Sequence, residues 1–124
     1  MRGVVQAIVR DAGILEAQIG IAVVDDAAIA KLHDEFLNDT DPTDVLSFLL
    51  ERSADILEGE VVVSADTARA NAPRYRATAE DELLRYVIHG ALHLVGYDDA
   101  TPRKRAVMRK KEREYLERGK RRGR

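Results

Sequence analysis

Apolar residues recur along this chain with two periods, one typical of helices and the other of strands. Ile29, Leu32 and Phe36 are spaced three or four positions apart, so they lie on one face of a helix. Such spacings predict five helices, over residues 4–15, 26–36, 64–72, 79–95 and 102–116. Runs rich in β-branched residues predict three strands, over residues 18–24, 44–50 and 59–64. The mixture indicates an α+β fold, a small mixed sheet of three to four strands with helices packed on it.

Capping and turn residues bound these segments. Candidate N-caps precede the second, third and fifth helices: Asp25 or Asp26, Ser64 and Thr101. Gly96 predicts the end of the fourth helix, and the polar residues 38–43 predict a loop. Because residues 118–124 hold no apolar side chain, we expect a single domain over residues 1–116 and a basic, disordered tail over residues 117–124.

Composition excludes several classes of protein. The chain has 124 residues, enough for one domain, and no cysteine, which excludes a disulfide scaffold, a cysteine-ligated metal and a thiol nucleophile. No apolar stretch approaches the roughly 20 residues that span a bilayer. The apolar start, residues 4–9, is too short for the core of a signal peptide. We therefore expect a cytoplasmic protein with no membrane partner.

Charge is distributed very unevenly along the chain. Residues 101–124 hold 12 of the 20 Lys and Arg residues and three acidic ones, a net +9, whereas residues 1–100 carry a net −11. A basic run is often only a solvated helix face, but this density is typical of a surface that binds a polyphosphate backbone. The run Arg103, Lys104 and Arg105 provides candidate substrate-binding residues.

The most informative pattern is a pair of histidines, His89 and His93, in the fourth predicted helix. They lie four positions apart, so both imidazoles can point the same way. They share the polar face of that helix, opposite its apolar stripe, with Glu82, Arg85 and Tyr86. Gly96 lets the chain turn back, and Asp99 can then bring a carboxylate to the same point. The spacing predicts a metal site at the end of a helix.

Two imidazoles and one carboxylate leave a fourth position open, as in catalytic Zn²⁺ sites. We expect one Zn²⁺, or another divalent metal, bound by His89, His93 and Asp99; the alternative is that the histidines are solvated surface residues. In the peptidase motif H-E-x-x-H a glutamate follows the first histidine and acts as general base. Gly90 takes that position here, and we expect it to keep space open beside the metal.

Three motifs in order resemble the bacterial rRNA maturation endoribonucleases of the YbeY type. The family pattern H-G-x-L-H-L-x-G-Y-D-H is matched from His89 to Asp98, with Asp99 at the third histidine. The family's T-D-V-L-S-F is matched in full at residues 43–48, and a G-D/E-I/V-x-I/V-S segment at residues 59–64. The resemblance covers residues 21–116 and implies a metal-dependent, single-strand-specific endoribonuclease that processes the 3′ end of small-subunit rRNA.

The resemblance also suggests roles for single residues. Asp44 and Ser47 would line the substrate groove, although Asp44 alone reads equally as a turn or cap residue. Asp98 either orients a ligand histidine or is a turn residue. The expected catalytic residues are therefore His89, His93, Asp44 and Asp98, and the expected substrate-binding residues are Ser47, Arg85, Arg103, Lys104 and Arg105. Phe48 is expected in the core, Tyr97 in a structural role and His33 on a helix surface.

The chain departs from the family pattern in three places. The third ligand is Asp99, which is normal chemistry for Zn²⁺. The family's arginine before T-D-V-L-S-F falls at Leu37, with Arg69, Arg74, Arg76 and Arg85 as candidate replacements. The strand that the family has before its first helix has no counterpart in this sequence, so we expect either a trimmed start or a sheet that is one strand smaller.

These observations favour a metal-dependent endoribonuclease with rRNA and the ribosome or its small subunit as partners, and no nucleotide cofactor. Two alternatives remain open. One is a zincin-like metallopeptidase, which Gly90 argues against. The other is a non-enzymatic RNA-binding or ribosome-binding module with a structural metal, which Leu37 at the arginine position favours.

Overall fold

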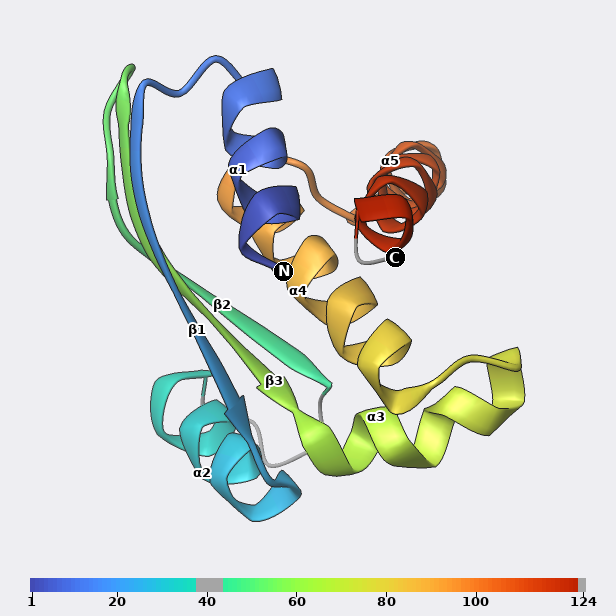
Figure 1. Cartoon of the computed structure of the whole chain (residues 1–124). Coiled ribbons are helices and arrows are strands. Elements are labelled where there is room, and N and C mark those ends of the chain that lie inside the picture. Colours follow the sequence, from blue (N-terminus) through green and yellow to red (C-terminus); the bar gives the residue numbers. More distant parts are fainter. Residues whose placement is uncertain (38–43, 123–124) are drawn as a thin grey trace.

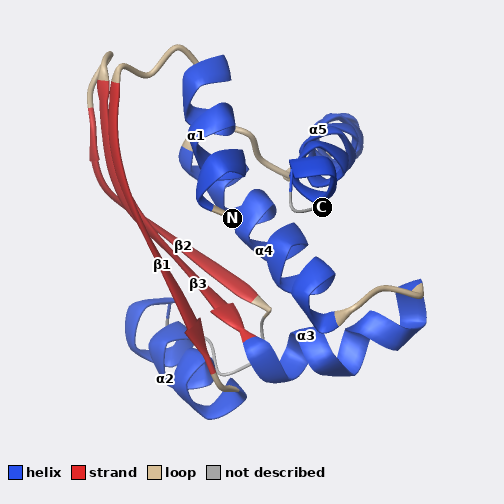
Figure 2. Ribbon diagram, viewed as in Figure 1, coloured by secondary structure: helices blue, strands red, loops and turns tan. Residues whose placement is uncertain are grey.

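Three strands form one sheet, and helices cover both of its faces (Figures 1 and 2). The computed structural model describes residues 1–37 and 44–122. The elements follow in the order α1 (Arg2–Asp11), β1 (Glu16–Val24), α2 (Asp26–Leu37), β2 (Val45–Arg52), β3 (Ile56–Ser64), α3 (Ala65–Asn71), η1 (Ala72–Tyr75), α4 (Ala79–Leu94) and α5 (Pro102–Arg122). The expected α+β fold is confirmed, and the described residues contain three strands. The predicted loop over residues 38–43 lies outside the described residues.

The last strand in sequence, β3, lies in the middle of the sheet. It pairs in parallel with β1, where Val24 lies opposite Ser64, and antiparallel with β2, where Val45 lies opposite Val63. Its side chains alternate between the two faces, because successive residues of a strand point in opposite directions. The central strand therefore contributes to the core on both sides.

Two apolar clusters fill the two faces of the sheet. On one face, α4 packs over β2 and β3, and α1 and α5 pack against α4; Leu57, Val61 and Val63 are fully buried there. On the other face, Ile29 of α2 packs against Leu46 and Val62. The predicted core position of Phe48 is confirmed, since it packs against this second cluster.

Helix α4 crosses the sheet at very short range, and two glycines make this possible. A Cβ atom built on Gly90 would lie 2.5 Å from Cγ1 of Val61 and 3.0 Å from Oγ of Ser47. A Cβ on Gly59 would lie 3.0 Å from Cδ1 and Cδ2 of Leu94 in α4. The expectation that Gly90 keeps space open beside the metal is therefore wrong, because that position faces β2 and β3.

Both ends of α4 have the caps that its sequence calls for. Thr78 accepts a hydrogen bond from the amide of Asp81, whose carboxylate in turn accepts one from the amide of Thr78. At the other end, Gly96 has a φ of +114°, a backbone conformation that favours glycine. The amide of Tyr97 then bonds back to the carbonyl of Leu92. This turn starts the segment that carries Asp99.

The fifth helix runs past its predicted end at Leu116 and reaches Arg122. Residues 117–122, which we expected in a disordered tail, form its last turns, and residues 123–124 lie outside the described residues. The end of α5 packs closely against α1 and α4, although its sequence is strongly charged. A Cβ on Gly119 would lie 2.7 Å from Val4 and 3.0 Å from Leu84. Arg118 adds an ion pair with Asp11, at 3.1 Å. Among the described residues, no helix has the length and apolar character needed to cross a membrane.

Candidate metal centre

The two histidines of α4 lie side by side, as their spacing predicts. Nε2 of His89 and Nε2 of His93 are 3.1 Å apart, and their ring centroids are separated by 4.6 Å. The turn at Gly96 brings back Asp99, and one ligand atom from each of the three residues lies within 4.8 Å of the others. The structure thus brings together the three residues expected to bind a metal.

The spacing of these atoms fits a small divalent cation. Zn²⁺ bonds histidine nitrogen at about 2.0–2.1 Å with tetrahedral angles, so two such nitrogens lie roughly 3.3 Å apart. The measured 3.1 Å between the Nε2 atoms is close to that value. His89 is half-buried, and Asp99 is exposed. A cation here would have protein on one side and an open position toward solvent.

A carboxylate that sequence reasoning missed orients His89. Nδ1 of His89 bonds to the Glu112 carboxylate of α5, whose side chain is 12% exposed. This bond leaves Nε2 directed at Asp99 and His93, and metal-ligating histidines almost always have such a partner. A signal was present in the sequence, since Glu112 is one of three acidic residues in the strongly basic segment 101–124.

The pKa values of the two histidines are shifted in opposite directions. Burial, the largest influence on His89, lowers its pKa, but the bond to Glu112 and the charges of Glu112, Asp44 and Asp99 together outweigh it, so the pKa is raised. The pKa of His93 is lowered, first by burial and then by the neighbouring charge of His89. The difference arises because only His89 has a bonded carboxylate.

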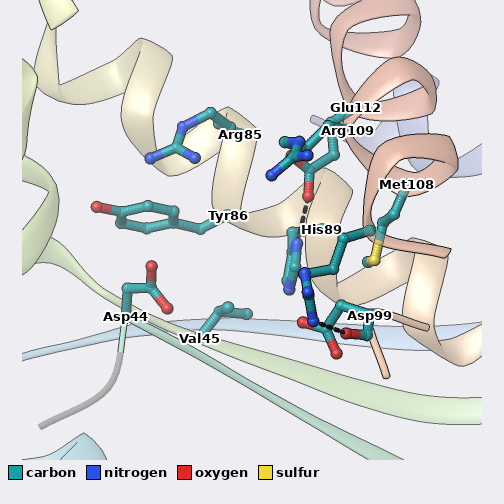
Figure 3. A pocket seen from close by; sticks show the side chains of 10 residues that line it. Asp44, Val45, Arg85, Tyr86, His89, Asp99, Met108, Arg109 and Glu112 are labelled. Atoms are coloured by element: carbon teal, nitrogen blue, oxygen red, sulfur yellow. Dashed lines mark hydrogen bonds and ion pairs between the residues drawn. The ribbon is translucent and has the colours of Figure 1, made fainter. Parts of the chain in front are cut away.

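The group opens onto a pocket between the start of β2, α4 and α5, with a volume of about 180 Å³ (Figure 3). Asp44 and Val45 line it from the β2 side, and α5 contributes Met108 and Glu112. Three arginines also line it: Arg85, Arg105 and Arg109. The pocket therefore combines possible metal ligands with several guanidinium groups.

The face of α4 that carries the histidines is partly buried. Tyr86 is 1% exposed and accepts a hydrogen bond from the side-chain amide of Asn71 at 3.0 Å. Glu82 is 3% exposed and accepts two bonds from Arg85, at 3.1 Å from Nε and 2.8 Å from Nη2. The polar face of α4 is thus buried at these two positions, because neighbouring side chains cover them.

Several other predicted residues lie close to the pocket but are occupied by other contacts. The Ser47 hydroxyl donates to the Gly90 carbonyl at 3.0 Å, which ties β2 to α4. Asp98 accepts bonds from the Ala100 amide and from Nζ of Lys104, at 3.1 and 3.3 Å, and none from a histidine. Among the described contacts, Asp98 therefore caps a turn rather than orienting a ligand.

The predicted arginines divide into two groups. Arg85 and Arg105 line the pocket, and Nη1 of Arg105 donates to the Asp99 carbonyl at 3.1 Å. Three of the candidates to replace the family arginine are exposed elsewhere: Arg69, Arg74 and Arg76. Arg103 is exposed and does not line the pocket. Of the four candidate replacements, only Arg85 lies at the site.

Two residues discussed in the sequence analysis, Tyr97 and His33, lie outside the pocket and are half-buried. Tyr97 is half-buried against the larger apolar cluster, as its expected structural role requires. His33 is half-buried on α2, which packs on the face of the sheet opposite to α4. It therefore lies away from the candidate metal centre.

Comparison with known proteins agrees with the motifs. The sequence model of the family described as "Endoribonuclease YbeY" matches residues 1–120. An endoribonuclease YbeY of Rhodopirellula baltica is 46% identical over 96 residues, which make up 76% of this chain and 50% of that protein. One of Salinibacter ruber is 38% identical over 124 residues, 94% of this chain and 79% of that protein.

A solved structure shares the fold. The solution structure of TM1509 from Thermotoga maritima superposes with a TM-score of 0.66 at 32% identity, covering 94% of this chain and 76% of that one. The present chain spans half the length of the Rhodopirellula relative. With the family match over residues 1–120, these findings show that the chain belongs to the endoribonuclease YbeY family.

Proposed function

We propose that this protein is a metal-dependent, single-strand-specific endoribonuclease that takes part in rRNA maturation at the 3′ end of small-subunit rRNA. The names of its relatives support the reaction class. The observation that carries the proposal is the meeting of His89, His93 and Asp99 within 4.8 Å beside a pocket lined by arginines. Metal ligands next to guanidinium groups suit an anionic phosphodiester better than a peptide.

Each ligand has a defined job in this proposal. His89 and His93 would hold one Zn²⁺ through Nε2, and Asp99 through a carboxylate oxygen. When bound, such a cation supplies a Lewis acid that polarises a phosphoryl oxygen and lowers the pKa of water. Glu112 fixes the ring of His89 from the side opposite to the cation.

The remaining pocket residues would bind and orient the substrate for in-line displacement at phosphorus. The Asp44 carboxylate lines the pocket, and we assign it to accept a proton from the attacking water as the new P–O bond forms. The bond from phosphorus to the leaving ribose oxygen then breaks, and that oxygen takes a proton from Asp44 or from solvent. Figure 3 shows it beside Tyr86, on the β2 side of His89. Arg85 and Arg105 would stabilise the negative charge of the phosphate.

A peptidase fits this site poorly. A zincin needs a glutamate at position 90, directed at the metal. Position 90 instead faces the sheet, where even a Cβ atom would lie 2.5 Å from Val61. Hydrolysis of casein by the purified protein would revive this alternative.

In the cell we propose the cytoplasm as the location, with the ribosome or its small subunit as partner and no nucleotide cofactor. The net charge of +9 over residues 101–124 supports contact with rRNA. The second candidate function is a non-enzymatic ribosome-binding module with a structural metal. Ribosome association that persists in a His93→Ala variant, with no cleavage by the wild type, would favour it.

Metal content and cleavage together test the proposal. Mass spectrometry of the purified protein should find about one Zn²⁺ per chain in the wild type and less in His93→Ala and Asp99→Ala. The wild type should cleave a single-stranded oligoribonucleotide and leave a duplex intact. EDTA should abolish this cleavage. A His33→Ala variant is the matched control, since His33 lies on the opposite face of the sheet. A wild type that binds no metal after reconstitution would refute the mechanism.

A further inference from the structure

Two arginines of the basic segment 101–124 lie on the side of α5 that lines the pocket. Arg105 and Arg109 lie one helical turn apart and both line the pocket. Arg85 lines it from α4. Four other basic residues of α5 are exposed and do not line the pocket: Arg103, Lys104, Lys110 and Arg113. The positive charge of α5 is therefore divided between arginines that line the pocket and basic residues that face solvent.

The three pocket arginines differ in the contacts that their guanidinium groups make within the protein. Arg85 is held by Glu82 and lies over the rings of Tyr75 and Tyr86, at 5.2 and 5.3 Å from their centroids. Arg105 donates to the Asp99 carbonyl. For Arg109, the described residues provide no hydrogen bond and no ion pair. Within residues 1–37 and 44–122, its guanidinium is therefore the one of the three that has no protein contact to give up when it binds a ligand.

The chemistry of that ligand follows from the group and its neighbours. A guanidinium presents paired N–H donors that match two phosphate oxygens. A nearby cation held by His89 and Asp99 would attract the same anion. The chain has two Phe, four Tyr and no Trp, so base stacking contributes little and the backbone dominates the contact.

We propose that Arg109 binds a backbone phosphate of single-stranded RNA at the pocket, flanked by Arg105, and so places the neighbouring phosphodiester against the His89–His93–Asp99 group. This inference rests on the proposed function for the identity of the ligand. Arg109 would thereby be a specific phosphate-binding residue, whereas the outward-facing charges of α5 would only raise the local concentration of RNA.

Binding measured without turnover tests this directly. Fluorescence anisotropy with a labelled single-stranded oligoribonucleotide in EDTA gives Kd for the wild type, Arg109→Ala and the matched control Arg113→Ala. Both changes remove one arginine from the same helix, but Arg113 does not line the pocket. We expect about tenfold weaker binding for Arg109→Ala and less than about twofold for Arg113→Ala. The slope of log Kd against log salt should fall by about 0.7 in Arg109→Ala.

Equal losses in the two variants would overturn the inference, because they would show that net charge alone matters. Arg109→Lys provides a second variant that keeps the charge and loses the paired geometry, and its affinity should fall between wild type and Arg109→Ala. Arg109→Ala should keep the wild-type melting temperature and metal content, since Arg109 is exposed.

The result is separable from the proposed function. If the wild type does not cleave RNA but Arg109→Ala still binds it about tenfold more weakly than Arg113→Ala, the endonuclease proposal fails and the phosphate site stands. If the wild type cleaves and the two variants bind equally, the proposed function stands and the assignment of Arg109 fails.

Discussion

Replacing Gly90 with alanine should destabilise the protein, although helix propensity alone predicts the reverse. Alanine in a helix interior is favoured over glycine by about 1 kcal/mol. The new Cβ, however, would lie 2.5 Å from Cγ1 and 3.1 Å from Cγ2 of Val61, which is fully buried. Val61 is β-branched and stiff at χ1, so it cannot rotate out of the way. Overpacking of this kind costs about 1–3 kcal/mol, and we take the upper end.

The net expectation is a loss of about 2 kcal/mol in the free energy of unfolding, or a melting temperature lower by roughly 6–10 °C. Thermal and urea unfolding followed by circular dichroism measure it. In a Val61→Ala background both contacts with Val61 are removed and only Oγ of Ser47, at 3.0 Å, stays close to the new Cβ, so adding Gly90→Ala should there cost less than about 0.5 kcal/mol. A Gly90→Ala protein as stable as the wild type would show that α4 and the sheet separate freely, and would refute the close packing described above.

Three further changes test the site and its supports. Glu112→Gln should weaken Zn²⁺ binding by about 10–100-fold, measured by chelator competition, because it removes the charged partner of His89; unchanged affinity would contradict that role. Gly96→Ala should lower the free energy of unfolding by about 1–2 kcal/mol, measured in urea, because alanine is strained at a φ of +114°. Burial and the hydrogen bond to Asp11 raise the pKa of Tyr115 to about 12, above its unfolded value of about 10. Its contribution to stability is therefore complete below about pH 10 and is lost as pH rises toward about 12, and Tyr115→Phe should lack this loss in urea titrations.

The meeting of the three candidate metal ligands could be predicted from sequence because its geometry is local. His89 and His93 are one helical turn apart, and Gly96 supplies the only backbone feature needed to return Asp99 to them. Both the helical period and the turn are properties of a few consecutive residues. Eleven positions therefore contain nearly all the information that the ligand set requires.

The rest of the pocket depends on contacts between distant segments. Glu112 lies 23 positions after His89, and its role follows from how α5 packs on α4. Gly90 has a role that only the sheet reveals, since its neighbours Val61 and Ser47 come from β3 and β2. Neither relation has a local period, so no spacing rule could find them.

Charge also concealed structure at the end of the chain. The run after Leu116 reads as a solvated tail because it lacks apolar side chains. Yet Gly119 allows α5 to approach Val4 and Leu84 closely, and Arg118 pairs with Asp11. A glycine can thus allow the end of a charged helix to pack closely against its neighbours. A hydropathy pattern does not predict such packing, because glycine has no apolar side chain.

The packing of α5 would link the proposed metal binding to the proposed RNA binding. Met108 and Tyr115 are 1% and 5% exposed, and they anchor the helix on the core. From that anchored helix, Glu112 bonds to His89 and Arg109 faces the pocket. A change that shifts α5 should therefore disturb both the metal ligand and the phosphate contact, whereas a change at Arg109 should disturb only the second. This separation is the reason that metal content and RNA affinity must be measured on the same set of variants.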